Sequence, residues 1–265
     1  MATSVQPGTA LITGATAGLG AAFARHLATD GHDLVLVARD RQRLTGLAHE
    51  LTDRHGVRVE VLDADLATET GCDRVAGRLQ QVDSPVDLLV NNAGIGLDRS
   101  FLRASWPDEH RLLQLNVQAV LRLTHATLPG MVQRQYGRVI NVSSVAGFGP
   151  VAPGSTYPAS KAWVTSFSQC IDQSVRHRGV RVMALCPGYV HTEFHQRAGI
   201  STAGSPGWLW LRAEDVVADG LRDLARGRAV SVPDLRYKLL AAVVRHAPYG
   251  LLRRAVAGPG KRASR

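Results

Sequence analysis

A glycine-rich stretch, Thr13-Gly14-Ala15-Thr16-Ala17-Gly18-Leu19-Gly20, indicates the architecture of this chain. It follows the apolar run Ala10-Leu11-Ile12 and precedes a helical pattern through Phe23 and Leu27. A strand, a glycine-rich turn and a helix form a cradle for phosphate, because glycines let the backbone approach a ligand and a helix N-terminus attracts negative charge. The spacing differs from the usual G-x-G-x-x-G, so the turn alone does not identify a nucleotide site.

The order of strand and helix repeats outward from this stretch. Apolar runs predict strands at residues 10–13, 33–38, 58–63, 86–91, 138–142, 180–186 and, more weakly, 229–232. Helical patterns fall at residues 18–30, 40–55, 70–81, 107–134, 155–178 and 213–226. This alternation predicts an α/β fold with a doubly wound parallel sheet and right-handed crossovers. Ligands of such sheets bind at the carboxyl ends of the strands, so the residues that follow each strand are candidate site residues.

A tyrosine and a lysine four positions apart lie in Tyr157-Pro158-Ala159-Ser160-Lys161. On a helix these two side chains share one face, and Pro158 is tolerated because it falls in the first turn of a helix that begins near residue 155. A phenol titrates near pH 10, and a cation within about 4–6 Å lowers its pKa. We therefore expect Lys161 to lower the pKa of Tyr157 toward the range useful for general acid–base catalysis. Such a pair is also common as a plain surface pair.

Further polar groups follow the other predicted strands. Asn91-Asn92-Ala93-Gly94 ends one strand, Ser143-Ser144 ends another, and Pro187-Gly188 ends a third. Ser144 precedes Tyr157 by thirteen positions. All of these groups are expected at the same edge of the sheet as Gly14.

Together these motifs resemble the short-chain dehydrogenase/reductase (SDR) family of nicotinamide-dependent oxidoreductases, in its NADP-preferring ketoreductase-like branch. The resemblance covers almost the whole chain and implies a Rossmann-type fold with Asn116, Ser144, Tyr157 and Lys161 as the catalytic set. The cofactor-binding residues that it implies are Gly14, Thr16, Gly18, Leu19, Gly20, Arg39, Asp65, Leu66, Asn92, Ala93, Gly94, Tyr157, Lys161, Pro187, Gly188, Val190 and Thr192. A homodimer or homotetramer is also implied.

The choice of cofactor depends on the end of the second strand, Ala38-Arg39-Asp40. An NAD enzyme places a carboxylate there for the ribose hydroxyls, whereas an arginine suits the 2′-phosphate of NADP. By resemblance, Ala38 occupies the carboxylate position and Arg39 the phosphate position, with Arg41 and Arg43 nearby. We expect NADP(H), with NAD(H) as the alternative, since Asp40 either serves the ribose or caps the following helix.

The resemblance implies hydride transfer between the nicotinamide and a ketone or secondary alcohol. Tyr157 is the general acid or base, and Ser144 donates a hydrogen bond to the substrate oxygen. Lys161 lowers the pKa of Tyr157 and holds the nicotinamide ribose, while Asn116 keeps a water behind Lys161. Ser143 is the alternative serine. The alternative function is a catalytically silent NADP-binding regulatory or interaction protein of the same fold.

The segment from Phe194 to Leu211 is rich in glycine, serine and proline and contains Trp208 and Trp210. It is interpreted either as a surface loop or as a lid whose tryptophans wall an apolar pocket. The substrate expected from this loop and from the resemblance is a lipophilic or 3-oxoacyl-type carbonyl compound. His191 and His195 are four apart, but they lack the HExxH order, and no metal site is expected.

Charge divides the chain at residue 235. Residues 1–235 hold 23 basic and 22 acidic residues, whereas residues 236–265 hold 8 basic and none that are acidic. We predict a catalytic domain at 1–235 and a basic helical extension at 236–265. This extension either packs on the body as a substrate-covering helix or makes a peripheral contact with an anionic membrane. Nucleic-acid binding is not expected, because no recognition motif accompanies the charge.

The remaining composition favours a cytoplasmic protein. At 265 residues and 45% apolar content the chain can bury one large core, and it has no apolar run long enough to span a bilayer and no visible secretory signal. Its three cysteines, Cys72, Cys170 and Cys186, lack CxxC spacing and are interpreted as reduced, buried thiols.

Overall fold

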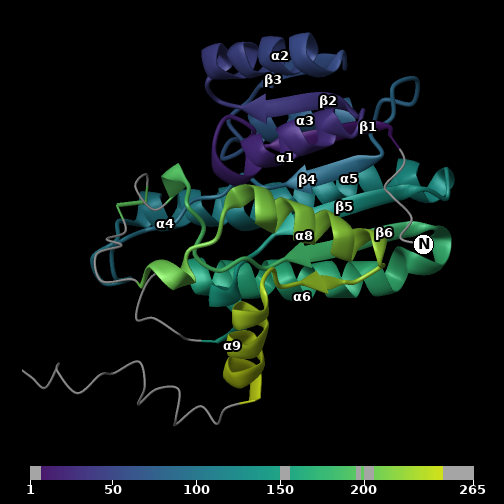
Figure 1. The fold of residues 1–265 in the computed structure, drawn as a ribbon. Coiled ribbons are helices and arrows are strands. Elements are labelled where there is room, and N and C mark those ends of the chain that lie inside the picture. Colours follow the sequence, from purple (N-terminus) through teal and green to yellow (C-terminus); the bar gives the residue numbers. More distant parts are fainter. Residues whose placement is uncertain (1–6, 150–155, 195–197, 200–205, 247–265) are drawn as a thin grey trace, which may run out of the picture.

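The computed structural model describes residues 7–149, 156–194, 198–199 and 206–246. Within them, seven strands form one parallel sheet in the order β3-β2-β1-β4-β5-β6-β7 (Figure 1). The strands are β1 Thr9–Thr13, β2 Asp33–Ala38, β3 Val59–Asp63, β4 Leu88–Asn91, β5 Gly137–Val142, β6 Val180–Leu185 and β7 Val230–Ser231. The predicted doubly wound sheet is confirmed, and its strand order reverses between β1 and β4.

Helices connect the strands and cover both faces of the sheet. They are α1 Gly18–Thr29, α2 Arg41–His55, α3 Glu69–Leu79, α4 Trp106–Leu113, α5 Ala119–Gln133, α6 Tyr157–Val175, α8 Ala213–Ala225 and α9 Leu235–His246. Short 3-10 turns occupy Val145–Phe148, Arg176–Arg178 and Gly207–Leu209. The single helix predicted over 107–134 is in fact α4 and α5 joined by a π-helical turn at Gln114–Gln118.

The core consists of two apolar layers, because successive strand side chains point to opposite faces. Ile12 of β1 belongs to the layer under α1, α2 and α8, whereas its neighbour Leu11 belongs to the layer under α3, α5 and α6. Phe23 is the largest fully buried side chain and packs α1 onto the first face. The two covered faces leave only the strand ends available for a ligand.

The described part of the predicted extension forms helix α9, whose first two turns pack on the body. In α9, Tyr237 and Ala241 are buried, and Tyr237 joins the core layer under α8. The division at residue 235 stays a prediction, and residues 247–265 lie outside the described residues. No helix in the described part of the chain is long and apolar enough to cross a membrane.

The cysteines, the expected lid and the start of α6 differ in part from the sequence predictions. Cys72 and Cys186 are buried free thiols, but Cys170 is exposed, because it falls on the solvent side of α6. Half of the expected lid, at residues 195–197 and 200–205, lies outside the described residues, as do His195 and the expected helix start at residue 155. Helix α6 begins at Tyr157, with Pro158 in its first turn.

Candidate active site

The glycine-rich turn brings the end of β1 against the start of α1. Gly14 has a φ of +66°, a conformation that side chains disfavour. A Cβ on Gly20 would lie 2.2 Å from the Gly14 carbonyl oxygen and 2.6 Å from Nδ2 of Asn92. Ala17, the N-cap of α1, provides no side-chain cap for the first helical amides. Backbone N–H groups without a cap at a helix N-terminus suit a phosphate ligand.

A hydrogen-bonded lock joins the carboxyl ends of β1 and β4 where the strand order reverses. The Thr13 hydroxyl accepts from the amides of Asn92 (2.9 Å) and Ala93 (3.0 Å). The Asn92 side chain in turn donates to the Thr13 carbonyl at 2.8 Å. The lock holds Asn92, Ala93 and Gly94 beside the glycine-rich turn.

The arginines that follow β2 have different surroundings. Asp40 caps α2 by accepting from the Arg43 amide at 3.0 Å. Arg41 pairs with Asp63, and Arg43 pairs with Glu193, each at 2.9 Å. Arg39 is exposed, and within the described ranges its guanidinium makes no hydrogen bond or ion pair.

Asp65 and Leu66 follow β3 at the same edge. The Asp65 carboxylate accepts from the Ala67 amide (3.1 Å) and from Arg111 (2.9 Å). Burial acts to raise the pKa of Asp65, but these hydrogen bonds outweigh burial and lower the pKa. The Leu66 side chain is buried in the core, so only its backbone is available to a ligand.

The π-helical turn at Gln114–Gln118 aims Asn116 into the protein. Its amide accepts from the Ile95 N–H and donates to the Ile95 carbonyl, both at 2.9 Å, and Nδ2 lies 3.3 Å from the Ser160 hydroxyl. A Cβ on Gly94 would lie 3.1 Å from Oδ1 of Asn116 and 3.5 Å from Nζ of Lys161. Asn116 and Lys161 therefore converge on Gly94, although they come from different helices.

The two serines after β5 point in different directions. The Ser143 hydroxyl is buried, where it donates to the Lys161 carbonyl at 2.7 Å and lies 2.7 Å from the Thr165 hydroxyl. Ser144 forms the hydrogen bond to the Tyr157 side chain. The geometry thus favours Ser144 over Ser143 as the serine beside Tyr157.

Tyr157 and Lys161 lie together as expected, with the ammonium nitrogen 5.7 Å from the centre of the phenol ring. The prediction that Lys161 lowers the pKa of Tyr157 is wrong. Burial raises the pKa of Tyr157 to about 12, with the Ser144 hydrogen bond acting the other way, and burial lowers the pKa of Lys161 to about 8. Desolvation disfavours both charged forms, and it exceeds the opposing effects of the Ser144 hydrogen bond on Tyr157 and of the Cys186 thiol on Lys161.

The segment after β6 reaches from the serine to the glycine-rich turn. The Pro187 carbonyl accepts from the Val145 amide at 3.0 Å and from the Ser144 hydroxyl at 3.5 Å. Val190 is buried and pairs with Leu211 in an isolated parallel bridge. A Cβ on Gly18 would lie 3.0 Å from the Thr192 side chain, so Thr192 packs over the turn.

A cavity of about 510 Å3 lies between α1, α2 and the segment after β6. Thr16, Gly18, Arg43, Thr192 and Glu193 are among its lining residues. Tyr157 and Ser144 do not line it, so the cavity adjoins the phosphate cradle and not the reacting groups. Leu19, the remaining predicted residue of the turn, is partly buried against the core under α1.

Sequence reasoning missed three residues near this edge. Glu193 pairs with Arg43 across 150 positions of chain, and the Phe194 ring lies 5.8 Å from the Tyr157 ring. Tyr237 packs against Gly188. Local sequence carries no signal for these contacts, because each is made between elements far apart in the chain.

The parallel sheet and the glycine-rich turn at its edge are those of an α/β protein of the dinucleotide-binding class. A family model described as short chain dehydrogenase matches residues 8–201. The chain belongs to the short-chain dehydrogenase/reductase family of oxidoreductases.

The similar proteins include two that are named as 3-oxoacyl reductases. The chain is 30% identical to a 3-oxoacyl-[acyl-carrier-protein] reductase of Aquifex aeolicus over 73% of this chain and 78% of that protein. It is 34% identical to a very-long-chain 3-oxoacyl-CoA reductase of Anas platyrhynchos, over 69% of this chain but only 60% of the duck protein.

Two solved structures are similar over nearly the whole chain. A short-chain dehydrogenase from Sphingobium yanoikuyae in complex with NADPH is 36% identical, with a TM-score of 0.83 and coverage of 97% of this chain and 99% of that one. A bulky-bulky ketone specific alcohol dehydrogenase from Comamonas testosteroni is 30% identical, with a TM-score of 0.79 and 98% coverage of each chain.

Proposed function

We propose that this protein is an NADPH-dependent reductase that converts a lipophilic ketone or 3-oxoacyl compound into a secondary alcohol. The observation that carries the proposal is the convergence of Ser144, Tyr157, Lys161 and Asn116 at one edge of the sheet, beside the glycine-rich turn. Fold alone would not support this function, because folds of this type host many activities.

The residues at the edge fit a nicotinamide dinucleotide. Because Gly14 and Gly20 carry no Cβ, the turn packs closely on itself and on Asn92, and the uncapped start of α1 offers amides for a pyrophosphate. The exposed Arg39 suits a 2′-phosphate, whereas Asp40 is engaged as the cap of α2. NAD(H) stays open as the second cofactor. When bound, the nicotinamide supplies the hydride.

The residues around Tyr157 support the reductive direction. A phenol with a pKa raised to about 12 is protonated at neutral pH, so it is ready to donate a proton to the carbonyl oxygen of a substrate. The Ser144 hydroxyl donates a hydrogen bond to the same oxygen as negative charge develops on it. The Lys161 ammonium stabilises the phenolate that remains, and Asn116 fixes the position of the backbone at Ile95 behind Lys161.

The expected substrate class is supported by aromatic side chains and by the relatives. Phe194 lies against Tyr157, and the Trp210 ring lies 5.4 Å from the Tyr189 ring. Relatives are named for 3-oxoacyl and bulky ketone substrates. A lipophilic carbonyl compound therefore fits better than a carbohydrate.

The proposed function is tested by following NADPH oxidation at 340 nm. The substrates offered are ketones that range in size from acetone to long 3-oxoacyl thioesters. We expect turnover with the bulky substrates and a loss of at least about 100-fold in kcat for Tyr157→Phe, because removal of a general acid costs about 10²–10⁴-fold. Bound NADPH without turnover of any ketone would instead support the catalytically silent binding protein.

Cofactor preference is tested by Arg39→Ala. Loss of one charge-assisted contact to the 2′-phosphate, worth about 1.5–3 kcal/mol, should raise the KM for NADPH by about 10- to 100-fold and leave the KM for NADH within twofold. Arg41→Ala is the matched control, because Arg41 is held by Asp63. If Arg39→Ala raised the KM for NADPH and the KM for NADH equally, or if Arg41→Ala raised the KM for NADPH more than Arg39→Ala does, the proposed role of Arg39 would be contradicted.

A cytoplasmic homodimer or homotetramer stays part of the proposal, as does a peripheral contact between the basic extension and anionic lipid. The lipid contact is supported by an apolar stripe on α9, where Leu235, Leu239 and Val243 are 69%, 62% and 62% exposed and lie four positions apart.

A further inference from the structure

The first turn of helix α9 packs against the turn that follows β6. Tyr237 is only 2% exposed, and a Cβ on Gly188 would lie 1.9 Å from Cζ of its ring. The ring therefore lies flat against the Gly188 backbone, and no side chain at position 188 is compatible with it. This contact joins the C-terminal helix to the predicted nicotinamide-side loop.

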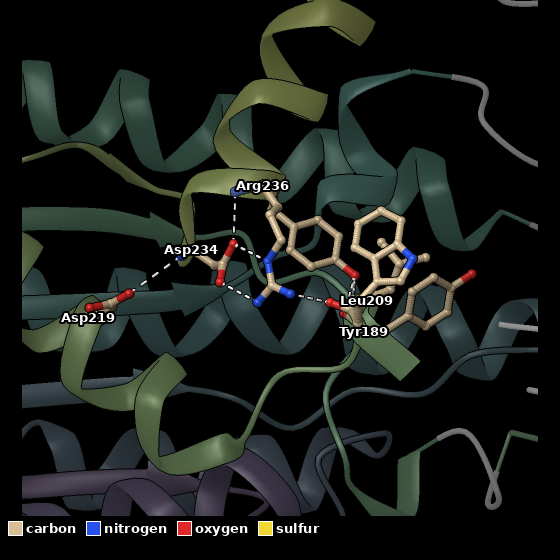
Figure 2. Close-up of polar contacts among 7 residues, drawn as sticks. Tyr189, Leu209, Asp219, Asp234 and Arg236 are labelled. Atoms are coloured by element: carbon tan, nitrogen blue, oxygen red, sulfur yellow. Dashed lines mark hydrogen bonds and ion pairs between the residues drawn. The ribbon is translucent and has the colours of Figure 1, made fainter. Parts of the chain in front are cut away.

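The Tyr237 hydroxyl bridges two segments that lie far apart in sequence. It accepts a hydrogen bond from the Tyr189 amide at 3.0 Å and donates one to the Leu209 carbonyl at 2.6 Å (Figure 2). The same two segments pair through their backbones, where the Leu211 amide donates to the Tyr189 carbonyl at 2.9 Å. A single side chain thus links both segments at one point.

Arg236 adds a second link from the same helical turn. Its guanidinium makes an ion pair with Asp234 at 2.6 Å and donates to the Trp208 carbonyl. Asp234 has a φ of +68°, and its amide lies 3.4 Å from a carboxylate oxygen of Asp219 in α8 (Figure 2). The first turn of α9 is thereby tied to α8 and to the 3-10 turn at Gly207–Leu209.

This clasp, formed by Tyr237 and Arg236, reaches the proposed catalytic serine through the backbone of Pro187 and Gly188. Gly188 follows Pro187, whose carbonyl accepts from the Val145 amide and the Ser144 hydroxyl. At the other end of α9, the Arg245 guanidinium lies 4.0 Å from the centre of the Phe148 ring. Helix α9 therefore contacts Gly188, which follows the hydrogen-bond acceptor of Ser144, and Phe148 in the 3-10 turn that follows Ser144.

We propose that Tyr237 is a positioning residue that sets the size of ketone the site accepts. Its ring packs on Gly188 beside the turn at Pro187, and its hydroxyl holds the segment from Tyr189 to Phe194, whose ring lies 5.8 Å from the Tyr157 ring, against the segment that carries Trp210. The Tyr189 and Trp210 rings lie 5.4 Å apart. The inference rests on the proposed reductase function and assigns the α9 clasp as the determinant of its substrate range.

Tyr237→Phe tests the inference, because it keeps the ring against Gly188 and removes only the bridging hydroxyl. We expect the KM for a bulky ketone to rise about tenfold, while kcat falls less than threefold and the dissociation constant for NADPH stays within twofold. The pH profile of kcat should not move, because the hydroxyl of Tyr237 contacts neither Tyr157 nor Lys161. Tyr136→Phe, with its ring 5.7 Å from the Arg138 guanidinium at the amino-terminal end of β5, is the matched control.

Amide hydrogen exchange gives a readout that does not depend on activity. In Tyr237→Phe, exchange in the segments 187–194 and 206–211 should accelerate at least tenfold, and Arg236→Met should accelerate 206–211 more than 187–194. Unchanged exchange in both segments, or a KM that rises equally for small and bulky ketones, would overturn the inference. Absence of turnover in the wild type would contradict the proposed function, while the exchange measurement would still test the clasp.

Discussion

Lys161 is the residue at which stability and function conflict. Its buried ammonium donates to the Val142 carbonyl at 2.8 Å, yet burial lowers its pKa from 10.5 to about 8. A shift of this size corresponds to roughly 3 kcal/mol of destabilisation while the folded protein carries the charge. The cation is therefore retained at a site that disfavours it, which is typical of functional groups.

Replacement of this cation should stabilise the fold. We predict that Lys161→Met raises the free energy of unfolding at pH 7 by about 2 kcal/mol, because relief of roughly 3 kcal/mol of desolvation is offset by about 1 kcal/mol for the lost hydrogen bond. The folded pKa lies below the unfolded one, so wild-type stability rises as the pH increases from about 8 to 10.5 and the advantage of the variant shrinks. Urea unfolding at pH 7 and pH 10 measures both effects, and a destabilised variant at pH 7 would contradict the prediction.

The same pKa sets the expected pH dependence of catalysis. Reduction needs a protonated Tyr157, which persists to about pH 12, and a charged Lys161, which persists to about pH 8. We predict that kcat for ketone reduction is flat at neutral pH and falls above about pH 8. Stopped-flow or steady-state rates from pH 6 to 10 measure this, and a rate that rises through this range would show that deprotonation activates the site.

Among the elements, the turn between β1 and α1 has the tightest steric requirement. We predict that Gly20→Ala raises the dissociation constant for NADPH at least tenfold, because its Cβ would overlap the Gly14 carbonyl and the Asn92 side chain. Gly77→Ala is the control, since a Cβ at that position of α3 meets nothing within 4 Å, and it should stabilise the protein by up to about 1 kcal/mol. Titration of the intrinsic fluorescence with NADPH gives the dissociation constants of both variants. Equal dissociation constants for the two variants would contradict the assignment of this turn as the phosphate cradle.

Element prediction from sequence succeeded where the apolar pattern is regular. The predicted strand at 33–38 coincides with β2, and the predicted helix at 40–55 begins one residue before α2, because Asp40 is its cap and not its first residue. The π-helical turn that presents Asn116 was missed, since a one-residue widening of a helix leaves no mark on apolar periodicity. The sequence predicted where the site residues lie, because they follow the ends of strands. It did not predict the pKa values of Tyr157 and Lys161, because these depend on burial in the folded protein.

At the scale of the whole molecule, the net positive charge of the chain is concentrated in residues 236–265. Helix α9 turns Tyr237 and Ala241 toward the body and leaves Leu235, Leu239 and Val243 exposed. We predict that the full chain sediments with vesicles containing anionic phosphatidylglycerol and not with phosphatidylcholine vesicles, and that high salt weakens this association. Leu239→Ser combined with Val243→Ser should reduce sedimentation, and unchanged sedimentation would exclude α9 as the contact.

Long-range contacts were the part of the molecule that sequence reasoning did not reach. The Arg43–Glu193 pair and the packing of Tyr237 on Gly188 join elements that meet only in the folded sheet. Neither residue pair has a recognisable spacing, so only the structure brings them to the site. The basic extension was recognised from charge, but its packing through Tyr237 was one of two alternatives.

Hydride transfer is the central claim, and the most direct test is the fate of deuterium from NADPH that carries deuterium at both C4 positions of the nicotinamide, since only one of the two is transferred. The purified chain is incubated with the labelled NADPH and a bulky ketone, and the product is analysed by mass spectrometry. We predict an alcohol with one deuterium on its carbinol carbon, formed by the wild type and not by Tyr157→Phe. An unlabelled product, or a product formed equally by Tyr157→Phe, would contradict the claim that this protein is a reductase with Tyr157 as its acid.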